Sequence, residues 1–324
     1  MTAPAARPAI TVIVPGHNVA PYAAEALDSL RRQTLQNWIA VLIDDESTDG
    51  TAGIFDEAAN ADSRFRVVRH AERTGLGAAR NTGLDRVDTP FLGFLDADDV
   101  LTPTALARLV GVLDETGSDF AAGAYVRLRP DDSGGYSPGM VQPWVAAATA
   151  PERRATTIDA HPDATANIVA WSKVSRTEFW HRVHLRFPEG KLYEDQVVAQ
   201  QMYARARRFD TIPDVVAQWR IRADGSSITQ REAQLDVLHD CLEAMDAGLH
   251  VLESAGHRLA AQARIGQMLR MDIPRLADIA RHHPDAAYRR ALGAFTREIW
   301  ARAGTAQDSL DEASATIVAA ARLW

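Results

Sequence analysis

The 324-residue sequence has one cysteine, Cys241, so no disulfide framework exists and the fold does not depend on an oxidising compartment. It has no run of about eighteen apolar residues, and its N-terminus lacks the apolar segment of a signal peptide. We therefore expect a cytoplasmic protein without a transmembrane segment, which leaves open a peripheral place at the inner face of a membrane. Basic residues are outnumbered, and the net charge of −8 argues against a nonspecific nucleic-acid binder, which needs a basic face.

Apolar and charged residues make up 46% and 24% of the chain, the proportions of an ordinary globular protein. In the first third, apolar runs rich in β-branched residues alternate with stretches of helical periodicity. The expected strands are at 9–15, 38–45, 65–70 and 91–98, and the expected helices are at 20–33, up to 61, at 75–87 and from 103. This alternation predicts an α/β fold with a mostly parallel sheet flanked by helices.

The pattern changes from Phe120 onward. Strands are expected at 120–130 and 215–222, helices at 175–183 and 194–209, and an exposed loop at 131–139. Beyond Gln230 the sequence shows only helical periodicity, rich in Ala, Leu and Arg. We expect an α/β domain at 1–230 and a helical C-terminal region at 231–324.

Polar residues follow three of the predicted strands at their carboxyl ends. Pro15 ends the first strand, Asp44 and Asp45 end the second, and Asp96 ends the fourth. In open sheets of this kind ligands bind beyond the carboxyl ends of the strands. The three strand ends should therefore face one crevice.

The segment FLGFLDADDV (91–100) places Asp96, Asp98 and Asp99 directly after a buried strand. Carboxylates this close repel one another unless a cation or water lies between them. Mg²⁺ and Mn²⁺ accept one or two protein carboxylates and complete their shell with substrate phosphates and water. The alternative is that these residues only favour the start of the helix at Pro103, where negative charge suits the dipole.

Two segments, TVIVPGHNVAPYAAEALDSLRRQTLQNWIAVLIDDESTDGT and GLGAARNTGLDRVDTPFLGFLDADD, resemble family 2 glycosyltransferases of the GT-A fold. The resemblance covers residues 9 to about 110 and resumes at 171–206 in WSKVSRTEFW and LRFPEGKLYEDQVVAQQMYARA. The layout is similar to that of transferases that decorate wall teichoic acids and capsular polymers. The resemblance implies a hexosyl- or N-acetylhexosaminyltransferase with Mn²⁺ or Mg²⁺ as cofactor.

The resemblance also implies residues that hold the donor, a UDP-sugar by preference. The first loop would shape the base slot, Asp45 would accept from uracil N3–H beside Asp44, and Arg80 would face the nucleotide or its phosphates. Asp96 would hold ribose or metal, and Asp98 would be the principal metal ligand. Arg222, with Ser226 or Ser227, would donate to the diphosphate. The expected donor and metal residues are Pro15, His17, Asn18, Asp44, Asp45, Arg80, Asp96, Ala97, Asp98, Arg222, Ser226 and Ser227.

The acceptor side is expected at LYEDQ, where Glu194 and Asp195 open a helix. In this family the equivalent carboxylate is the general base that takes the proton from the acceptor hydroxyl. We assign this role to Asp195, with Glu194 as the alternative base or an acceptor contact. The expected acceptor is a glycan or a polyol-phosphate polymer, and a single displacement would invert the anomeric configuration. The C-terminal helices would serve as acceptor platform, cover or oligomer interface.

Two other interpretations are open at this point. GLGAAR (75–80) follows a strand and opens a helix, as in a dinucleotide-binding dehydrogenase, but Arg80 replaces the third glycine. The chain could also be an inactive scaffold of this fold, or part of a larger polymer-synthesis enzyme. Homo-oligomerisation, the donor sugar and the acceptor are left undecided by the sequence.

Overall fold

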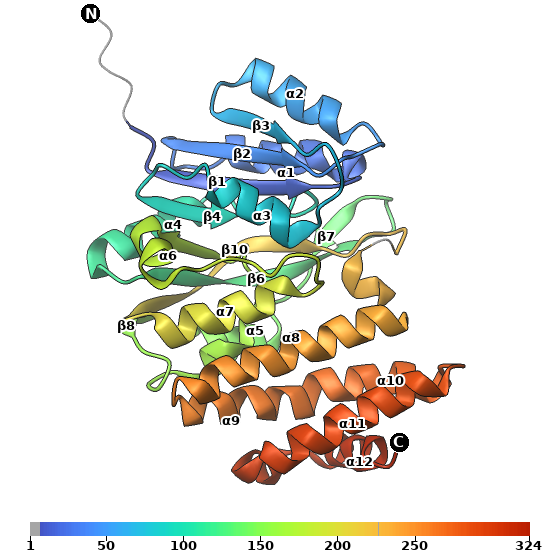
Figure 1. The fold of residues 1–324 in the computed structure, drawn as a ribbon. Coiled ribbons are helices and arrows are strands. Elements are labelled where there is room, and N and C mark those ends of the chain that lie inside the picture. Colours follow the sequence, from blue (N-terminus) through green and yellow to red (C-terminus); the bar gives the residue numbers. More distant parts are fainter. Residues whose placement is uncertain (1–6, 226) are drawn as a thin grey trace, which may run out of the picture.

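The computed structural model describes residues 7–225 and 227–324, and it places the α/β part of the chain around one sheet (Figure 1). The strands are β1 Ile10–Gly16, β2 Trp38–Asp44, β3 Phe65–Arg69, β4 Phe91–Phe94, β5 Val100–Leu101, β6 Phe120–Pro130, β7 Tyr136–Pro138, β8 Arg153–Thr156, β9 Lys173–Arg176 and β10 Phe209–Arg220. The helices of this part are α1 Ala20–Arg31, α2 Thr51–Ala61, α3 Leu76–Leu84, α4 Ala105–Thr116, α5 Pro143–Thr149, α6 Thr177–Val183 and α7 Glu194–Arg205, with short 3₁₀ turns at Pro162–Ala166 and Ile228–Arg231.

The strand order is β3-β2-β1-β4-β9-β6-β10-β5, with β7 on β6 and β8 on β10. Strands β1 to β4 pair in parallel, and so do β6 and β10. Every residue of β1 and β2 is buried, as expected for parallel strands with helices on both faces. Since β2, β1 and β4 are neighbours, their carboxyl ends meet at one edge of the sheet, as predicted.

The α/β fold class is confirmed, but the sheet contains antiparallel strands that the sequence pattern did not reveal. Strand β9 lies between β4 and β6 and runs antiparallel to both. Its residues, Lys173–Arg176, were assigned in part to a helix, which begins only at Thr177. The reason is that a four-residue strand with a single apolar residue, Val174, carries too few apolar positions to define a period.

Helix α4 also begins two residues later than predicted, at Ala105 instead of Pro103. The buried side chain of Gln33 accepts a hydrogen bond from the backbone N–H of Leu106 at 3.0 Å and satisfies one of the unpaired donors of the first turn. The carbonyl oxygen of Pro103 accepts from Thr34 N at 2.9 Å. Contacts with the α1–β2 connection therefore fix where this helix starts.

From residue 235 the chain is helical, in agreement with its periodicity, and these helices stack beyond β6 and β10 at the lower end of Figure 1. They are α8 Leu235–Ser254, α9 Arg258–Gln267, a π-helical segment Met268–Asp272, α10 Ile273–His282, α11 Ala286–Arg302, a 3₁₀ turn Gly304–Ser309 and α12 Glu312–Ala321. Helix α8 packs along α7, and buried residues of both parts belong to one hydrophobic core. The division at residue 230 stays a prediction.

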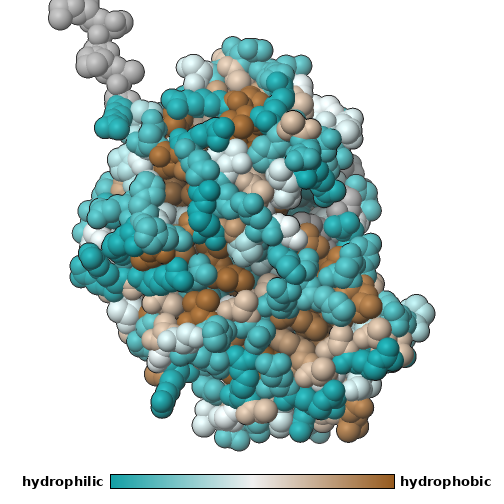
Figure 2. Space-filling view, in the orientation of Figure 1, coloured by the Kyte–Doolittle hydropathy of each residue, from teal (hydrophilic) through white to brown (hydrophobic). Residues whose placement is uncertain are grey.

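Apolar residues on the face shown in Figure 2 form scattered patches between hydrophilic ones, and no single apolar band crosses that face. No helix among the described residues combines the length and the apolar character that crossing a membrane requires.

Candidate functional site

The site lies at the edge of the sheet where β1, β2 and β4 end. Pro15 and Gly16 end β1, Asp44 ends β2, and the carbonyl of Pro15 accepts from Ala97 N at 3.3 Å, just beyond β4. Gly16 is required here because a Cβ at this position would lie 2.9 Å from the ring of Phe55. The predicted residues on these three strands are therefore brought together.

The loop after β1 is held to the loop after β2 by side chains of both. His17 Nδ1 lies 2.7 Å from the carbonyl oxygen of Asp45, which can only accept, so this nitrogen donates. Asn18 adopts a left-handed conformation with φ of 51° and accepts from Thr48 N at 2.8 Å, while its own N–H donates to Ser47. His17 and Asn18 thus form one rigid wall at the end of the sheet.

Asp45 organises the turn between β3 and α3. Its Oδ1 accepts from Thr74 N at 2.9 Å and Thr74 Oγ1 at 2.8 Å, and its Oδ2 accepts from Gly75 N at 2.8 Å. His70 Nδ1 is 2.7 Å from the same Oδ1. Burial raises the pKa of Asp45, but the hydrogen bonds from Thr74, His70 and Gly75 outweigh burial and lower it. Asp45 is ionised and, like Asp44 beside it, buried.

Arg80 joins the two carboxylate clusters that the sequence indicated. Its guanidinium is buried, donates to Asp96 Oδ1 at 2.6 Å, and forms an ion pair with Glu194 from α7. Burial lowers the pKa of Arg80, but the charges of Asp96 and Glu194 outweigh it, so the group stays charged. Its ion pairs are with carboxylates on both sides of the site, and the role predicted for Arg80 at the nucleotide stays a prediction.

Asp98 and Asp99 point to different environments. Oδ2 of Asp98 accepts from Arg222 Nε at 2.8 Å, and its side chain is 16% exposed. Asp99 is buried, and its Oδ1 accepts from the backbone N–H of Arg220 at 2.8 Å. Burial and the charges of Asp98 and Asp96 raise the pKa of Asp99. Asp99 therefore fixes the end of β10, just before Arg222, and the side chain of Asp98 stays partly exposed.

Asp195 lies in the first turn of α7, next to Glu194. The pKa of Asp195 is raised above its ordinary value, mainly by burial and also by the charge of Asp96. The positive charges of Arg80 and Lys173 oppose this rise. Glu194 is 3% exposed and paired with Arg80, whereas Asp195 is partly accessible. Of the two carboxylates, Asp195 is the one that a substrate can reach.

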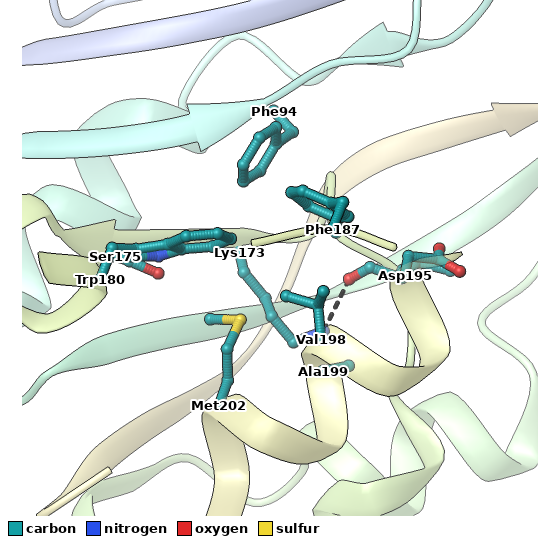
Figure 3. Close-up of a pocket in the computed structure, with 11 residues that line it drawn as sticks. Phe94, Lys173, Ser175, Trp180, Phe187, Asp195, Val198, Ala199 and Met202 are labelled. Carbon is teal, nitrogen blue, oxygen red and sulfur yellow. Dashed lines mark hydrogen bonds between the residues drawn. The ribbon is translucent and has the colours of Figure 1, made fainter. Parts of the chain in front are cut away.

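A small cavity of about 10 Å³ lies behind Asp195, between α7, β4 and β9, as Figure 3 shows. Its wall includes Phe94, Trp180 and Phe187, which pack ring against ring, and the buried Lys173. The ammonium of Lys173 donates to both oxygens of Asn167 and to the carbonyl of Val169 at 2.7–2.8 Å. This cavity is close to the smallest that holds one water, so it supports Asp195 from behind and is not a substrate pocket.

Asp96 and Asp98 fit a divalent metal shared with a substrate. Their side chains are 21% and 16% exposed, so a ligand can reach both. Among the described residues, no group of three His, Cys, Asp or Glu side chains is arranged to hold a metal. Mg²⁺ or Mn²⁺ nevertheless needs only one or two protein carboxylates when a diphosphate and water complete its shell. The donor set suits such a shared ion.

Several residues that the sequence analysis missed complete the site. His70 sits between Asp45 and Thr82, whose Oγ1 is 2.9 Å from Nε2. Arg220 donates to the carbonyl of Asp98 at 2.7 Å, pairs with Glu25, and lies 4.3 Å from the centre of the Tyr136 ring. His70 follows the third strand just as Asp45 follows the second, which was a usable signal. Nothing in the sequence near Arg220 indicated its partners.

The glycines of GLGAAR have a structural reason unrelated to a dinucleotide. A Cβ at Gly77 would lie 2.0 Å from the carbonyl oxygen of Pro188, so only glycine allows α3 to approach the segment before α7. Gly75 has φ of 91°, a conformation that favours glycine, and its N–H donates to Asp45. The motif thus brings Arg80 to Glu194.

Residues 11–190, more than half of the chain, match the sequence profile of glycosyl transferase family 2. The chain belongs to this family. Glycosyltransferase GlyA of Streptococcus pneumoniae is 28% identical over 303 residues, which cover 89% of this chain and 42% of GlyA. EpsJ of Bacillus subtilis, described as an uncharacterized glycosyltransferase, is 30% identical over 202 residues, which cover 62% of this chain and 58% of EpsJ. The family 2 chain thus spans about half the length of these two relatives.

Among solved structures, residues 1–349 of S. aureus TarS in complex with UDP match this chain with a TM-score of 0.71 and 20% identity, covering 97% of this chain and 87% of that one. This likeness confirms the predicted GT-A-type fold with its helical C-terminal region.

In the family 2 chain the last predicted donor segment follows β10. Ser227 begins a 3₁₀ turn there and its N–H donates to Gln230 at 3.2 Å, whereas Ser226 lies outside the described residues.

Proposed function

We propose that this chain is an inverting glycosyltransferase that uses a UDP-sugar and Mn²⁺ or Mg²⁺, and that it transfers a hexosyl or N-acetylhexosaminyl group. The acceptor is a hydroxyl of a glycan or polyol-phosphate polymer. The observation behind the proposal is that the buried guanidinium of Arg80 pairs with Asp96, on the proposed donor side, and with Glu194, next to Asp195. This arrangement supports a site in which the donor, bound near Asp96, lies next to the acceptor, bound near Asp195.

On the donor side, Asp45 is the proposed acceptor for uracil N3–H, since an ionised carboxylate can only accept. His17 and Asn18 wall the base slot, and TarS, a structural neighbour, was solved with UDP. Asp96 and Asp98 are the proposed metal ligands. When bound, the metal would neutralise the charge of the departing diphosphate. Arg222 and Ser227 follow β10 and are proposed to donate to that diphosphate.

On the acceptor side, Asp195 is the proposed general base. The acceptor oxygen attacks C1 of the sugar, the bond from C1 to the diphosphate oxygen breaks, and Asp195 takes the hydroxyl proton. One displacement on the face opposite the leaving group inverts the anomeric carbon. Because Arg80 holds Glu194, that neighbour is proposed to position Asp195.

The helices after residue 230 are proposed to hold α7 in place. Tyr193, just before α7, donates to Glu232 at 3.1 Å, and Glu232 forms an ion pair with Arg275 of α10. Arg264 of α9 donates to Gln196 of α7 at 3.2 Å. This network supports a role for the C-terminal region as a cover that fixes the acceptor side.

The function is tested by a screen of nucleotide sugars for donor hydrolysis, with Mn²⁺ and with chelator. Release of UDP that needs the metal is the expected result. Equilibrium binding of UDP is measured in the same two conditions, and absence of binding in both would contradict the proposal.

A further inference from the structure

A row of polar side chains leads away from Asp195 along β6, from a buried tyrosine to an exposed arginine. Tyr125, Arg127 and Arg129 alternate with Val126 and Leu128, so they share one face of this strand. The charges of both Asp195 and Arg127 act on the Tyr125 hydroxyl, whose pKa burial raises to about 12. Tyr125 is therefore near enough to both the proposed base and the arginine to feel their charges.

Two indole rings flank Arg127. Trp219 stands opposite Arg127 in the β6–β10 register, and Trp144 comes from the first turn of α5. The guanidinium carbon is 5.6 Å from the centre of each ring. A guanidinium at this distance from two aromatic rings gains cation–π attraction from both.

Neither arginine has a carboxylate partner among the described residues, although the chain carries 43 acidic residues. The Nε of Arg127 is buried and has no hydrogen-bond partner in the described part of the chain. Burial and the charges of Arg129 and Arg275 lower the pKa of Arg127. In the described part of the chain, Arg127 and Arg129 thus lie on one face of β6 without a carboxylate partner, whereas Arg275, whose charge also acts on Arg127, is paired with Glu232 and Asp272.

We infer that Arg127 and Arg129 form an anion-binding subsite for the acceptor, flanked by the Trp144 and Trp219 rings. The acceptor is then a chain that carries phosphate or carboxylate groups next to the hydroxyl that reacts at Asp195. Residues two apart on a strand are about 7 Å apart, so the anion lies roughly one repeat unit from Tyr125. Indole rings suit the faces of sugar or polyol units between the anions. The inference rests on the proposed function, whose acceptor class it names.

The test is equilibrium binding of three soluble probes to the full chain. They are a glycerol-phosphate oligomer, a uronic-acid oligomer and a neutral oligosaccharide of the same length. Arg127→Gln and Arg129→Gln are compared with Arg66→Gln, which removes an exposed arginine of β3 at the far edge of the sheet. UDP is titrated into every variant.

The expected result is binding of at least one anionic probe that weakens roughly tenfold in Arg127→Gln and in Arg129→Gln, because each removes a charge-assisted contact. Binding should be unchanged in Arg66→Gln and should weaken with salt. The anionic probe that binds identifies the acceptor group as phosphate or carboxylate. If Arg127→Gln does not fold, Arg129→Gln alone decides.

The inference is overturned if neither anionic probe binds, if the neutral probe binds equally, or if the folded variants bind like the wild type. Unchanged UDP binding in that case leaves the proposed function standing. If the wild type does not bind UDP at all, that result contradicts the proposed function instead, whatever the three probes do.

Discussion

Arg222 Nε lies 2.8 Å from Oδ2 of Asp98, so an arginine compensates the carboxylate proposed as principal metal ligand. A divalent ion bound at Asp98 would compete with this contact, and Arg222, which follows β10, is the residue proposed to donate to the diphosphate. We therefore expect metal binding and donor binding to be coupled through this ion pair.

The first prediction concerns this pair. In calorimetric titration, Mn²⁺ should strengthen UDP binding to the wild type, and Asp98→Asn should abolish that gain because it removes the ligand charge. Arg222→Gln should bind Mn²⁺ alone more tightly but UDP more weakly. Asp28→Asn, which breaks a surface pair with Arg31, is the control and should change neither. UDP affinity that is equal with metal and with chelator would refute the metal assignment.

The second prediction concerns selectivity for the nucleotide base of the donor. UDP should bind more tightly than ADP, GDP or CDP, since these bases do not present uracil N3–H to Asp45. Asp45→Asn should weaken this preference and lower the free energy of unfolding by about 1–3 kcal/mol, because Thr74 and Gly75 lose a charged acceptor. Competition titrations and urea denaturation measure the two effects. A clear preference for CDP would overturn the assignment of Asp45.

The third prediction concerns stability. Arg80→Met leaves Glu194 buried without its counter-charge and should lower the free energy of unfolding by about 3–5 kcal/mol. Adding Glu194→Gln should recover part of the loss. The matched control is Arg186→Met, which breaks an exposed pair with Asp85 and should cost at most about 1 kcal/mol. Equal losses in the two single variants would show that burial of the Arg80 pair has no special weight.

The part of the site formed by consecutive strand ends was predictable from the sequence. Residues 10–16 and 38–44 are mostly apolar, and the carboxyl ends of these two strands must meet at one edge because parallel neighbours point the same way. The strand pattern alone therefore places Asp45 and Asp96 at the same edge of the sheet.

The pairing of Arg80 with Glu194 could not be predicted from residue patterns, because the two are 114 positions apart in the chain. It depends on how closely α3 approaches α7, which Gly77 permits. The insertion of β9 beside β4 was missed for a similar reason, since a short strand is defined by its neighbours. Such contacts depend on tertiary packing, which local propensity does not encode.

The fourth prediction concerns pH. Burial raises the pKa of Asp195, and the charge of Lys173 is one of the influences that lower it. A general base works when ionised, so kcat/KM should fall on the acid side, below that pKa. Lys173→Met removes a lowering charge and should move this acidic limb to higher pH. Lys191→Met, which removes an exposed lysine paired with Glu243, is the control. If the acidic limb of the kcat/KM profile stays at the same pH in a folded Lys173→Met variant, Lys173 does not influence the pKa of Asp195.

The last prediction separates chemistry from binding at Asp195. Asp195→Asn keeps the size and shape of the side chain but removes its capacity to take a proton. General-base assistance contributes ~10²–10⁴-fold, so turnover with a confirmed acceptor should fall by about that factor. UDP affinity should barely change, because the proposed donor contacts lie at the carboxyl ends of β1, β2 and β4 and after β10.

Glu194→Gln is the matched comparison one residue away. It should reduce stability through Arg80, and any loss of turnover should be smaller than in Asp195→Asn because Glu194 is buried in its ion pair with Arg80. Asp98→Asn should differ from both, since it loses metal and therefore UDP affinity as well as rate. Near-normal turnover in Asp195→Asn would show that Asp195 is not the base, and the same measurement on Glu194→Gln would then test the remaining candidate.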